Sequence, residues 1–343
     1  MTRPLVAIDA RAAVRAEIGG VERYAREMAS RLPALRPERY RVVAPPAALA
    51  HRAGHVWEQA LLPFARGALL YCPANLAPLA SRRNVVVIHD AAALRHPEAY
   101  SRVYVEYQRR MLPAIAAGAR LVITVSEFSR GELVELLGLS AERVVVIGEG
   151  VSERFCQGLD PGPARRAYGL KRPYVLALGT VSARKNLPAL EPAARALERL
   201  GIELVLAGSD RGYLRGTAPE LRRLGYVADE QLPGLYAGAL ALVMPSLHEG
   251  FGLPCLEAMA AGIPVVAAAS GALPETCGGA ALLVSPSDPG ELSQAVLAAA
   301  TDEHVRARLI ADGLRNAAGR TWRRTAELTD AAIEPLLPAR TRG

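Results

Sequence analysis

The 343-residue sequence lacks the features of several protein classes. Its four cysteines are scattered, with neither a CxxC pair nor the spacing of a zinc site, which excludes a disulfide framework and favours a reduced, cytoplasmic protein. The first residues lack the apolar core of a signal peptide, because Asp9 and Arg11 interrupt it. No window approaches the roughly 20 uninterrupted apolar residues of a spanning helix. We therefore expect neither export nor a transmembrane segment.

Lysine and aromatic residues are also scarce. Only Lys171 and Lys185 are lysines among 41 basic residues, and aromatic residues make up 5% of the chain. The net charge of +7 would suit nucleic acid, anionic lipid or phosphorylated small molecules as partners. Because the positive charge is dispersed and no nucleic-acid-binding motif accompanies it, nucleic acid is not expected as a partner.

Short apolar, β-branched runs alternate with amphipathic Ala/Leu/Arg segments along the chain. This alternation is typical of βα units around a parallel sheet, and the apolar character of the runs predicts helices on both faces. The chain length fits two domains of about 150 residues each. We predict strands at 5–9, 42–44, 69–71, 85–88, 121–125 and 144–147, and a second series at 174–178, 203–208, near 225–227, 239–244, 264–268 and 281–284.

A Gly- and Pro-rich stretch, 156–173, separates the two series and is interpreted as a linker with a short helix. We predict an α/β protein of two Rossmann-like, doubly wound domains, 1–160 and 161–320, with a last helix in 321–343 that packs back on the first domain. Two such domains facing each other would bind ligands in a cleft, at the carboxyl ends of their strands.

The segment 246–266, SLHEGFGLPCLEAMAAGIPVV, carries the sharpest motif. A strand ends near Pro245, a glycine-containing loop follows, and a helix begins around Leu253. The free backbone N–H groups at such a helix start are suited to bind a diphosphate. The glycines let the diphosphate approach the backbone closely, because they have no Cβ. Glu249 and Glu257 are able to accept hydrogen bonds from sugar hydroxyls. In the alternative, Glu257 merely favours the first helical turn and Glu249 is a solvated loop residue.

A second motif lies in 176–190, LALGTVSARKNLPAL, where a strand ends at Gly179. Arg184 and Lys185 follow in the loop before a helix. Two adjacent cations there would neutralise the phosphates of a departing nucleoside diphosphate, as metal ions do in other enzymes. The alternative is a solvated helix start, which is disfavoured because cations are unfavourable near a helix N-terminus.

These residues carry a resemblance to a known family. The stretch from Gly179 to Val284 resembles the donor-binding domain of family 4 of the retaining GT-B glycosyltransferases, on its motif of a Glu, seven residues and a Glu. The N-terminal half is similar to the same family at 19–28, 85–98 and 124–130. The resemblance covers roughly residues 5–330 and implies a GT-B fold.

The resemblance also implies roles for individual residues. Arg184 and Lys185 would bind the diphosphate, Glu257 the ribose hydroxyls and Glu249 the transferred sugar, while His89 would contact the sugar and help to position the acceptor. The alternative for His89 is a strand-end histidine with satisfied hydrogen bonds, and His96 and His248 are expected to be structural or solvated. The other donor-binding candidates are Gly19, Gly20 and Gly179 near the phosphates, Tyr226 and Val227 near the base, and the amides of Phe251, Gly252 and Leu253.

The activity implied by the resemblance is transfer of a hexose from a nucleoside-diphosphate sugar to a hydroxyl of a glycan, a lipid-linked or a small-molecule acceptor. GDP-mannose is the first choice of donor, followed by UDP- and dTDP-sugars, with retention of configuration and without a metal or cofactor. The alternatives are a sugar-nucleotide epimerase or hydrolase of the same fold, and a non-catalytic sugar-nucleotide-binding protein. A dehydrogenase is disfavoured, because no GxGxxG follows the first strand.

The segment 97–120 mixes tyrosines, arginines and apolar residues. Such a mixture predicts peripheral contact with anionic lipid at the inner face of the cell membrane. The alternative is an ordinary surface helix whose arginines extend over apolar neighbours.

Overall fold

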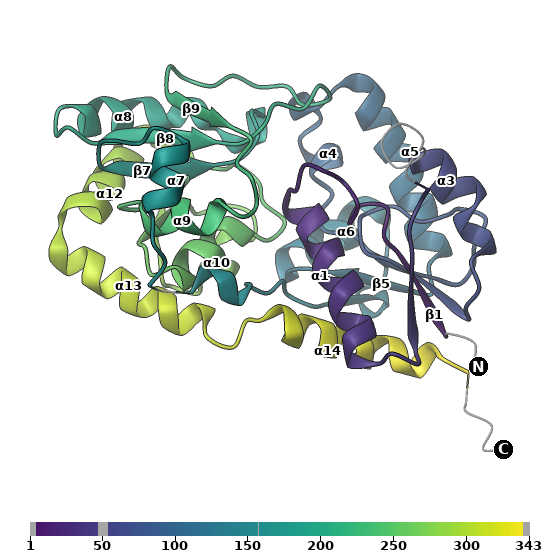
Figure 1. Cartoon of the computed structure of the whole chain (residues 1–343). Helices are drawn as coiled ribbons and strands as arrows, with labels where there is room; N and C mark the ends of the chain where they lie inside the picture. The colour runs from purple at the N-terminus through teal and green to yellow at the C-terminus, as the bar shows by residue number, and fades with distance from the viewer. Residues whose placement is uncertain (1–4, 47–53, 157, 339–343) are drawn as a thin grey trace. The chain divides into compact units, whose positions relative to one another are not determined.

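The computed structural model describes residues 5–46, 54–156 and 158–338. Contacts divide the chain into two compact units, which Figure 1 shows. Unit 1 contains Met1–Ala91, Glu106–Glu149 and Trp322–Gly343, and unit 2 contains Ala92–Val105 and Gly150–Thr321. The contacts thus separate the units after Glu149, and they assign residues 92–105 to unit 2 although these lie within the first series of strands.

Within the described residues, unit 1 is built on a parallel six-stranded sheet of order β2-β1-β3-β4-β5-β6. Most of the strand residues are buried, as expected for a parallel sheet that is covered on both faces. The strands are β1 (Val6–Asp9), β2 (Tyr40–Val43), β3 (Leu69–Cys72), β4 (Asn84–Val87), β5 (Leu121–Thr124) and β6 (Val144–Val146).

The helices of unit 1 begin and end at identifiable signals. The Ser126 side chain accepts a hydrogen bond from the Ser129 N–H at the start of α6, which ends before Gly138 in the left-handed conformation. Helix α14 packs along α1 and brings the end of the chain to unit 1. The elements are α1 (Gly20–Leu35), α3 (Gly54–Ala60), η1 (Leu62–Phe64), α5 (Arg102–Gly118, which begins in unit 2), α6 (Glu127–Leu137), η3 (Ala141–Arg143), α14 (Trp322–Ile333) and η7 (Glu334–Leu336).

The described part of unit 2 contains a second parallel sheet of six strands, in the order β12-β11-β10-β7-β8-β9. The two parallel sheets confirm the predicted α/β fold class. Strand β9 begins three residues before the predicted position near 225–227 and overlaps it only at Gly225. The strands are β7 (Tyr174–Leu178), β8 (Glu203–Ala207), β9 (Arg222–Gly225), β10 (Leu242–Met244), β11 (Val265–Ala268) and β12 (Leu282–Val284).

Helices cover the sheet of unit 2. One face packs against η6, α8 and α12 through a core that includes Val175, Leu206, Val243, Leu197 and Val296. The elements are α4 (Ala92–Arg95), η2 (Pro97–Ala99), η4 (Glu153–Phe155), α7 (Gly162–Ala167), η5 (Ala183–Lys185), η6 (Leu187–Leu190), α8 (Glu191–Glu198), α9 (Leu232–Ala237), α10 (Leu253–Ala260), α11 (Leu273–Cys277), α12 (Pro289–Thr301) and α13 (Glu303–Ala317). Among the described residues, no helix is both long and apolar enough to cross a membrane.

Candidate functional site

The order of strands in unit 2 brings the two predicted motifs together. Strand β10 pairs with β7 in parallel, so the loops after both strands emerge side by side at the carboxyl edge of the sheet. The Lys185 Nζ donates to Glu249 Oε1 at 2.5 Å, and Arg184 Nη1 lies 3.3 Å from Glu249 Oε2. Arg184 Nη1 also donates to the carbonyl of His248 at 3.0 Å. Arg184, Lys185 and Glu249 therefore form one charged cluster.

This cluster is largely withdrawn from solvent, and its charges determine its protonation. The side chains of Arg184, Lys185 and Glu249 are 17%, 10% and 10% exposed. Burial raises the pKa of Glu249, but Lys185 and Arg184 outweigh burial and lower this pKa to about 2. Burial lowers the pKa of Lys185, and Glu249 opposes that shift. With the carboxylate ionised and both bases protonated, the cluster has a net charge of +1 and is suited to bind an anion.

Gly179 allows Lys185 to reach this position. The backbone φ of Gly179 is +153°, a value that residues other than glycine rarely adopt. A Cβ at Gly179 would lie 3.1–3.4 Å from the end of the Lys185 side chain. The lysine therefore passes directly over the backbone at the end of β7.

The second half of the Glu motif lies on helix α10. Gly252, at φ +95°, precedes this helix, and Phe251 and Leu253 on either side of it are buried. Glu257 is 3% exposed, and its Oε2 accepts a hydrogen bond from the Tyr236 hydroxyl at 2.9 Å. Because Glu249 is also only 8% exposed, the alternative of a solvated loop residue is wrong.

The predicted base-binding residues lie at another part of the same unit. Tyr226 and Val227 directly follow β9, the edge strand, which β8 separates from β7. Tyr226 is half-buried and Val227 is buried. Nearby, Arg154 forms an ion pair with Asp229 at 2.5 Å. The described structure brings Tyr226 and Val227 to the same sheet as the charged cluster, two strands away from β7.

His89, in unit 1, follows strand β4. Its backbone N–H, its carbonyl and both of its ring nitrogens have hydrogen-bond partners. Its N–H donates to Asn75 Oδ1 at 2.8 Å, and its carbonyl accepts from the Ser129 hydroxyl at 2.9 Å. The ring nitrogens lie 3.1 Å from Glu149 Oε1 and 3.0 Å from the Pro73 carbonyl. A carboxylate and a backbone carbonyl can both accept hydrogen bonds, so this arrangement favours a His89 ring that is protonated at both nitrogens.

Two further observations agree with this state of His89. Burial by itself lowers the pKa of His89, but the hydrogen bond and charge of Glu149 outweigh it, so that the pKa lies above its usual value. The ring is 5% exposed and meets the ring of Tyr24 edge-on at 4.8 Å. These contacts agree with the alternative of a histidine whose hydrogen bonds are satisfied within its own unit.

Gly19 and Gly20 stand at the start of α1 in unit 1. The Glu22 carboxylate accepts a hydrogen bond from the Gly19 N–H at 3.0 Å, which caps the helix. A Cβ added at Gly20 would meet nothing within 4 Å. Gly20 therefore faces open space within the described structure, and its lack of a side chain is not required by packing.

Three partners of the site were missed at the sequence level. They are Glu149, which binds His89, Tyr236, which binds Glu257, and the His248 carbonyl, which binds Arg184. His248 is buried, with its ring edge-on to that of His96 at 5.2 Å. The one available signal was that Glu149 closely follows a strand of the same sheet as His89, because parallel strands present their following residues at one edge.

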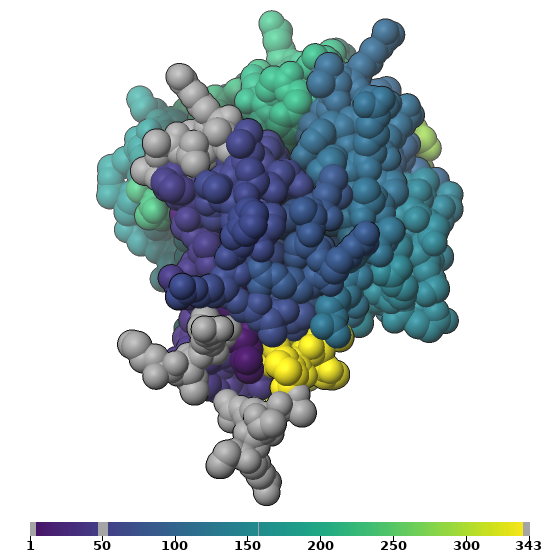
Figure 2. Space-filling model, turned by 90° about the vertical axis from the view of Figure 1, so that its right-hand side faces the viewer, coloured from purple at the N-terminus to yellow at the C-terminus, as the bar shows by residue number. Residues whose placement is uncertain are grey.

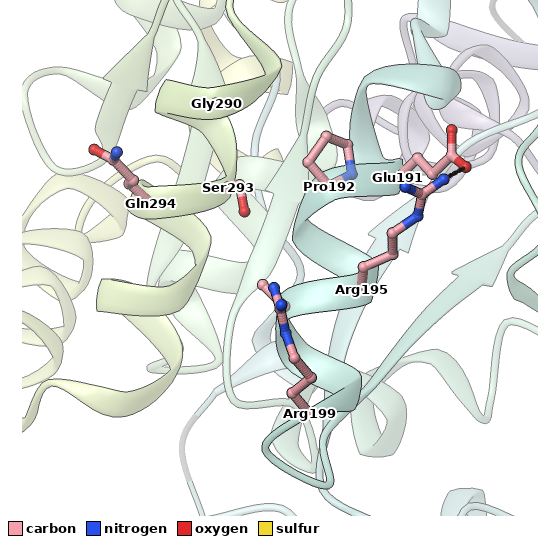
Figure 3. Close-up of a pocket in the computed structure, with 8 residues that line it drawn as sticks. Glu191, Pro192, Arg195, Arg199, Gly290, Ser293 and Gln294 are labelled. Carbon is pink, nitrogen blue, oxygen red and sulfur yellow. Dashed lines mark hydrogen bonds and ion pairs between the residues drawn. The ribbon is translucent and has the colours of Figure 1, made fainter.

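A groove of about 500 Å³ lies elsewhere on unit 2, between helices α8 and α12. Figure 3 shows that Glu191 and Arg195 pair across one turn of α8, while Ser293 and Gln294 lie on α12. None of the predicted site residues lines this groove. In the described part of the chain, no cluster of three or more His, Cys, Asp or Glu side chains has the arrangement of a metal site.

Comparison with solved structures supports the two-sheet architecture. The chain superimposes on a sucrose-phosphate synthase from Thermosynechococcus elongatus with a TM-score of 0.74 and 20% identity, over 97% of this chain and 99% of that one. It superimposes on WaaG, a glycosyltransferase involved in lipopolysaccharide biosynthesis, with a TM-score of 0.71 and 16% identity, over 99% and 100% of the chains. At these identities the similarity shows the fold, which is GT-B.

Sequence comparison shows the family. A model of "Glycosyl transferases group 1" matches residues 172–302, and one of "Glycosyltransferase Family 4" matches residues 64–155. The O-antigen chain mannosyltransferase B of Escherichia coli is 36% identical over 256 residues, 70% of this chain and 67% of that protein. The serotype-specific mannosyltransferase WbdA of Escherichia coli is 29% identical over 280 residues, and the match spans only 34% of its length. The chain belongs to family 4 of the GT-B glycosyltransferases.

Proposed function

We propose that the protein transfers mannose from GDP-mannose to a hydroxyl of a glycan or lipid-linked acceptor, with retention of configuration. The observation that carries this proposal is the cluster of Arg184, Lys185 and Glu249 at the carboxyl edge of the sheet in unit 2. Relatives named as mannosyltransferases favour mannose. UDP-sugars remain the second choice of donor, since the fold neighbour HepE of Anabaena was solved with UDP.

In the proposed reaction, Arg184 and Lys185 hold the diphosphate, and Glu249 accepts hydrogen bonds from hydroxyls of the transferred sugar. The acceptor oxygen attacks the anomeric carbon on the face from which the diphosphate leaves, and the departing phosphate takes the proton. Charge stabilisation of the departing diphosphate by the two cations takes the role that metal ions have in other enzymes. We propose Glu257 for the ribose, Tyr226 and Val227 for the base, and Gly19, Gly20, Gly179 and the amides of Phe251, Gly252 and Leu253 for close approach to the donor.

Two measurements test the proposal. Thermal unfolding with GDP, UDP and dTDP identifies the preferred base, because a ligand that binds only the folded state raises its stability by mass action. A transfer assay with the matching sugar nucleotide, in the presence of EDTA, then tests activity without a metal. We expect Lys185→Ala and Glu249→Ala each to lower turnover about 100-fold or more, with unchanged circular dichroism.

The outcomes separate the alternatives. Release of free sugar or an epimer in the absence of any acceptor would favour a hydrolase or epimerase. Tight binding of a sugar nucleotide with no turnover would favour a non-catalytic binding protein. Turnover of Lys185→Ala at the wild-type rate would contradict the role given to the cations. Inversion at the anomeric carbon, measured by NMR of the product, would contradict the proposed stereochemistry.

We also propose a peripheral contact with anionic lipid at the cytoplasmic face of the membrane, through unit 1. In the segment 97–120, Tyr100 stacks on Tyr104, and Tyr104 stacks on Tyr213, so these rings are packed against one another within unit 2. In the described part of unit 1, the most exposed large apolar side chains lie on α3, η1 and the residues between them. Val56 is 65%, Leu61 is 51% and Phe64 is 83% exposed.

The surroundings of these apolar residues favour an anionic surface. Figure 2 shows the segment of α3 and η1 on one face of unit 1. Residues 59–89 contain three arginines and no acidic residue. The guanidinium of Arg83 donates to the carbonyls of Pro63 and Ala65 at 2.8 and 2.6 Å, which holds the turn that presents Phe64. Arg66 and Arg82 are exposed, and exposed arginines beside apolar anchors are typical of peripheral membrane binding.

Flotation with vesicles of phosphatidylcholine and phosphatidylglycerol at low salt tests this contact. We expect the wild-type protein to float and Phe64→Ser to float several-fold less. Leu200→Ser is the matched control, because Leu200 is 58% exposed but lies in unit 2. An equal loss in both variants, or no flotation of the wild-type protein, would contradict the proposal.

A further inference from the structure

Glu249 is already occupied by the two cations that are proposed to hold the diphosphate. Its Oε1 lies 2.5 Å from Lys185 Nζ and its Oε2 lies 3.3 Å from Arg184 Nη1, so both carboxylate oxygens are used. Without a ligand, the carboxylate neutralises one of the two positive charges. A diphosphate that enters this site must share or replace these ion pairs.

On the basis of the proposed function, we infer that Glu249 is an internal counter-anion that competes with the diphosphate for Lys185 and Arg184, and thereby promotes release of the nucleoside diphosphate after transfer. Glu249 thus has a second role, in addition to its proposed hydrogen bonds with the sugar. The competition affects the donor and the product differently, because their charges differ.

The chemistry of transfer explains the difference. The bond between the anomeric carbon and the phosphate oxygen breaks, its electron pair stays on the phosphate, and a bond forms between the anomeric carbon and the acceptor oxygen. The acceptor proton passes to the phosphate and from there to water. The product therefore carries one more negative charge than the donor at neutral pH, and it has lost the sugar hydroxyls with which Glu249 forms hydrogen bonds. The repulsion between Glu249 and the diphosphate is then no longer offset by hydrogen bonds to the sugar. The Glu249 carboxylate pairs again with Lys185 and Arg184.

Glu249 keeps its charge under all conditions in which the protein would work. Its carboxyl group, with a pKa of about 2, is ionised throughout the neutral range. The pKa of Lys185, in contrast, is lowered by burial, and loss of Glu249 would remove an interaction that raises it. Binding should therefore be measured slightly below neutral pH, because a lower pH favours the protonated form of Lys185.

The backbone of this loop is held independently of the carboxylate. The carbonyl of Glu249 accepts a hydrogen bond from the Ala272 N–H at 2.9 Å, and the carbonyl of Arg184 accepts one from the Leu247 N–H at 2.7 Å. Glu249→Gln preserves the shape of the side chain and removes only its charge. We therefore expect the loops to keep their positions in this variant.

Titration calorimetry at pH 6.5 tests the inference. The ligands are inorganic pyrophosphate and whichever of GDP, UDP and dTDP the wild-type protein binds most tightly. We expect Glu249→Gln to bind both ligands about tenfold more tightly than the wild-type protein, since one nearby like charge changes such an equilibrium by about this factor. The transfer rate of the variant should fall, so that tighter binding is accompanied by slower turnover.

Glu191→Gln is the matched control for the loss of one negative charge. Glu191 also forms an ion pair with an arginine of unit 2, but its side chain is 53% exposed and lies in the groove between α8 and α12. Its affinity for both ligands should equal that of the wild-type protein. A similar gain in both variants would attribute the effect to net charge and overturn the inference.

The inference and the proposed function fail in different ways. If the wild-type protein binds a nucleoside diphosphate but Glu249→Gln binds it equally or more weakly, the inference is wrong and the proposed function stands. If the wild-type protein binds none of the three diphosphates, both are wrong. If Glu249→Gln unfolds at the assay temperature, Glu249→Ala replaces it in the same comparison. A second measurement compares the affinities of the wild-type protein for the donor and for the product. Equal affinity for donor and product would contradict the inference.

Discussion

Gly179 connects a backbone conformation to the placement of a functional side chain. At φ +153°, an alanine would be strained, and its Cβ would press on the Lys185 side chain. We expect Gly179→Ala to lower the free energy of unfolding by about 1–3 kcal/mol and to weaken diphosphate binding. Urea unfolding followed by circular dichroism measures the first effect, and calorimetry with GDP measures the second.

The control for this substitution is Gly212→Ala in the same unit. A Cβ at Gly212 meets nothing within 4 Å, and its φ is outside the left-handed region. Unchanged stability and binding are expected there. Equal stability of Gly179→Ala and Gly212→Ala would contradict the requirement for glycine at the end of β7.

The pair of His89 and Glu149 should make the stability of unit 1 depend on pH. The folded pKa of His89 is raised, so its contribution is fully present below the unfolded pKa of 6.5 and is lost as the pH rises through the folded pKa. Asp90 also raises this pKa, and the Tyr24 ring covers the imidazole without a charge at neutral pH. We expect the wild-type protein to lose more stability than Glu149→Gln between pH 6 and pH 9.

Tryptophan fluorescence during urea unfolding measures this difference in unit 1. Asp9 and the other titrating groups are present in both proteins, so their contributions to the pH dependence of stability largely cancel in the comparison. Identical pH profiles would show that Glu149 does not hold a protonated His89. In that event the neutral histidine would be available for the sugar contact that the family resemblance implies.

At the scale of elements, helix α14 is held to unit 1 by a buried carboxylate. Asp330 Oδ1 accepts hydrogen bonds from Arg39 Nη1 at 2.6 Å and from the Tyr40 hydroxyl at 2.7 Å. The Asp330 side chain is only 7% exposed and that of Arg39 is 12% exposed. Because the substitution removes the acceptor of the Tyr40 hydroxyl and leaves Arg39 with the exposed Glu334 as its ion-pair partner, we expect Asp330→Ala to cost about 1–3 kcal/mol of unfolding free energy.

Urea unfolding measures this cost, and Glu334→Ala provides the comparison. Glu334 pairs with the same Arg39, but its side chain is 61% exposed, so its removal should cost less than about 1 kcal/mol. Equal costs for the two substitutions would contradict the importance of burial at Asp330. The burial of Trp322 at the start of α14 supports the same attachment, since this side chain is 1% exposed.

At the scale of the whole molecule, the two units have separate sheets, and one spectroscopic signal is specific to unit 1. The chain contains two tryptophans, Trp57 and Trp322, and both are buried in unit 1. Fluorescence therefore reports unit 1, whereas circular dichroism reports both units. If the diphosphate binds chiefly to the cluster in unit 2, saturating GDP should raise the midpoint seen by circular dichroism more than the midpoint seen by fluorescence.

Differential scanning calorimetry with and without GDP checks this expectation directly. Two overlapping transitions should separate as the ligand stabilises unit 2. An equal shift in both signals would show that the ligand stabilises both units together, contrary to the expectation. The Lys185→Ala variant should show neither shift.

The sequence by itself determined the elements of this protein and the chemistry of its two loops. Apolar runs such as 174–178 mark strands because a parallel sheet buries both faces, and this signal is local. The glycines and charges after β7 and β10 are likewise local, and the family resemblance gave them candidate roles.

Only the tertiary structure decided which of these groups meet. The pairing of β7 with β10 joins Glu249 to Lys185, 64 positions earlier, and the arrangement of unit 1 joins Glu149 to His89, 60 positions earlier. Likewise, the assignment of residues 92–105 to unit 2 had no signal in the periodicity. The physical reason is that strand order and long-range ion pairs depend on packing between distant segments, whereas hydrophobic periodicity reports only the nearest neighbours along the chain.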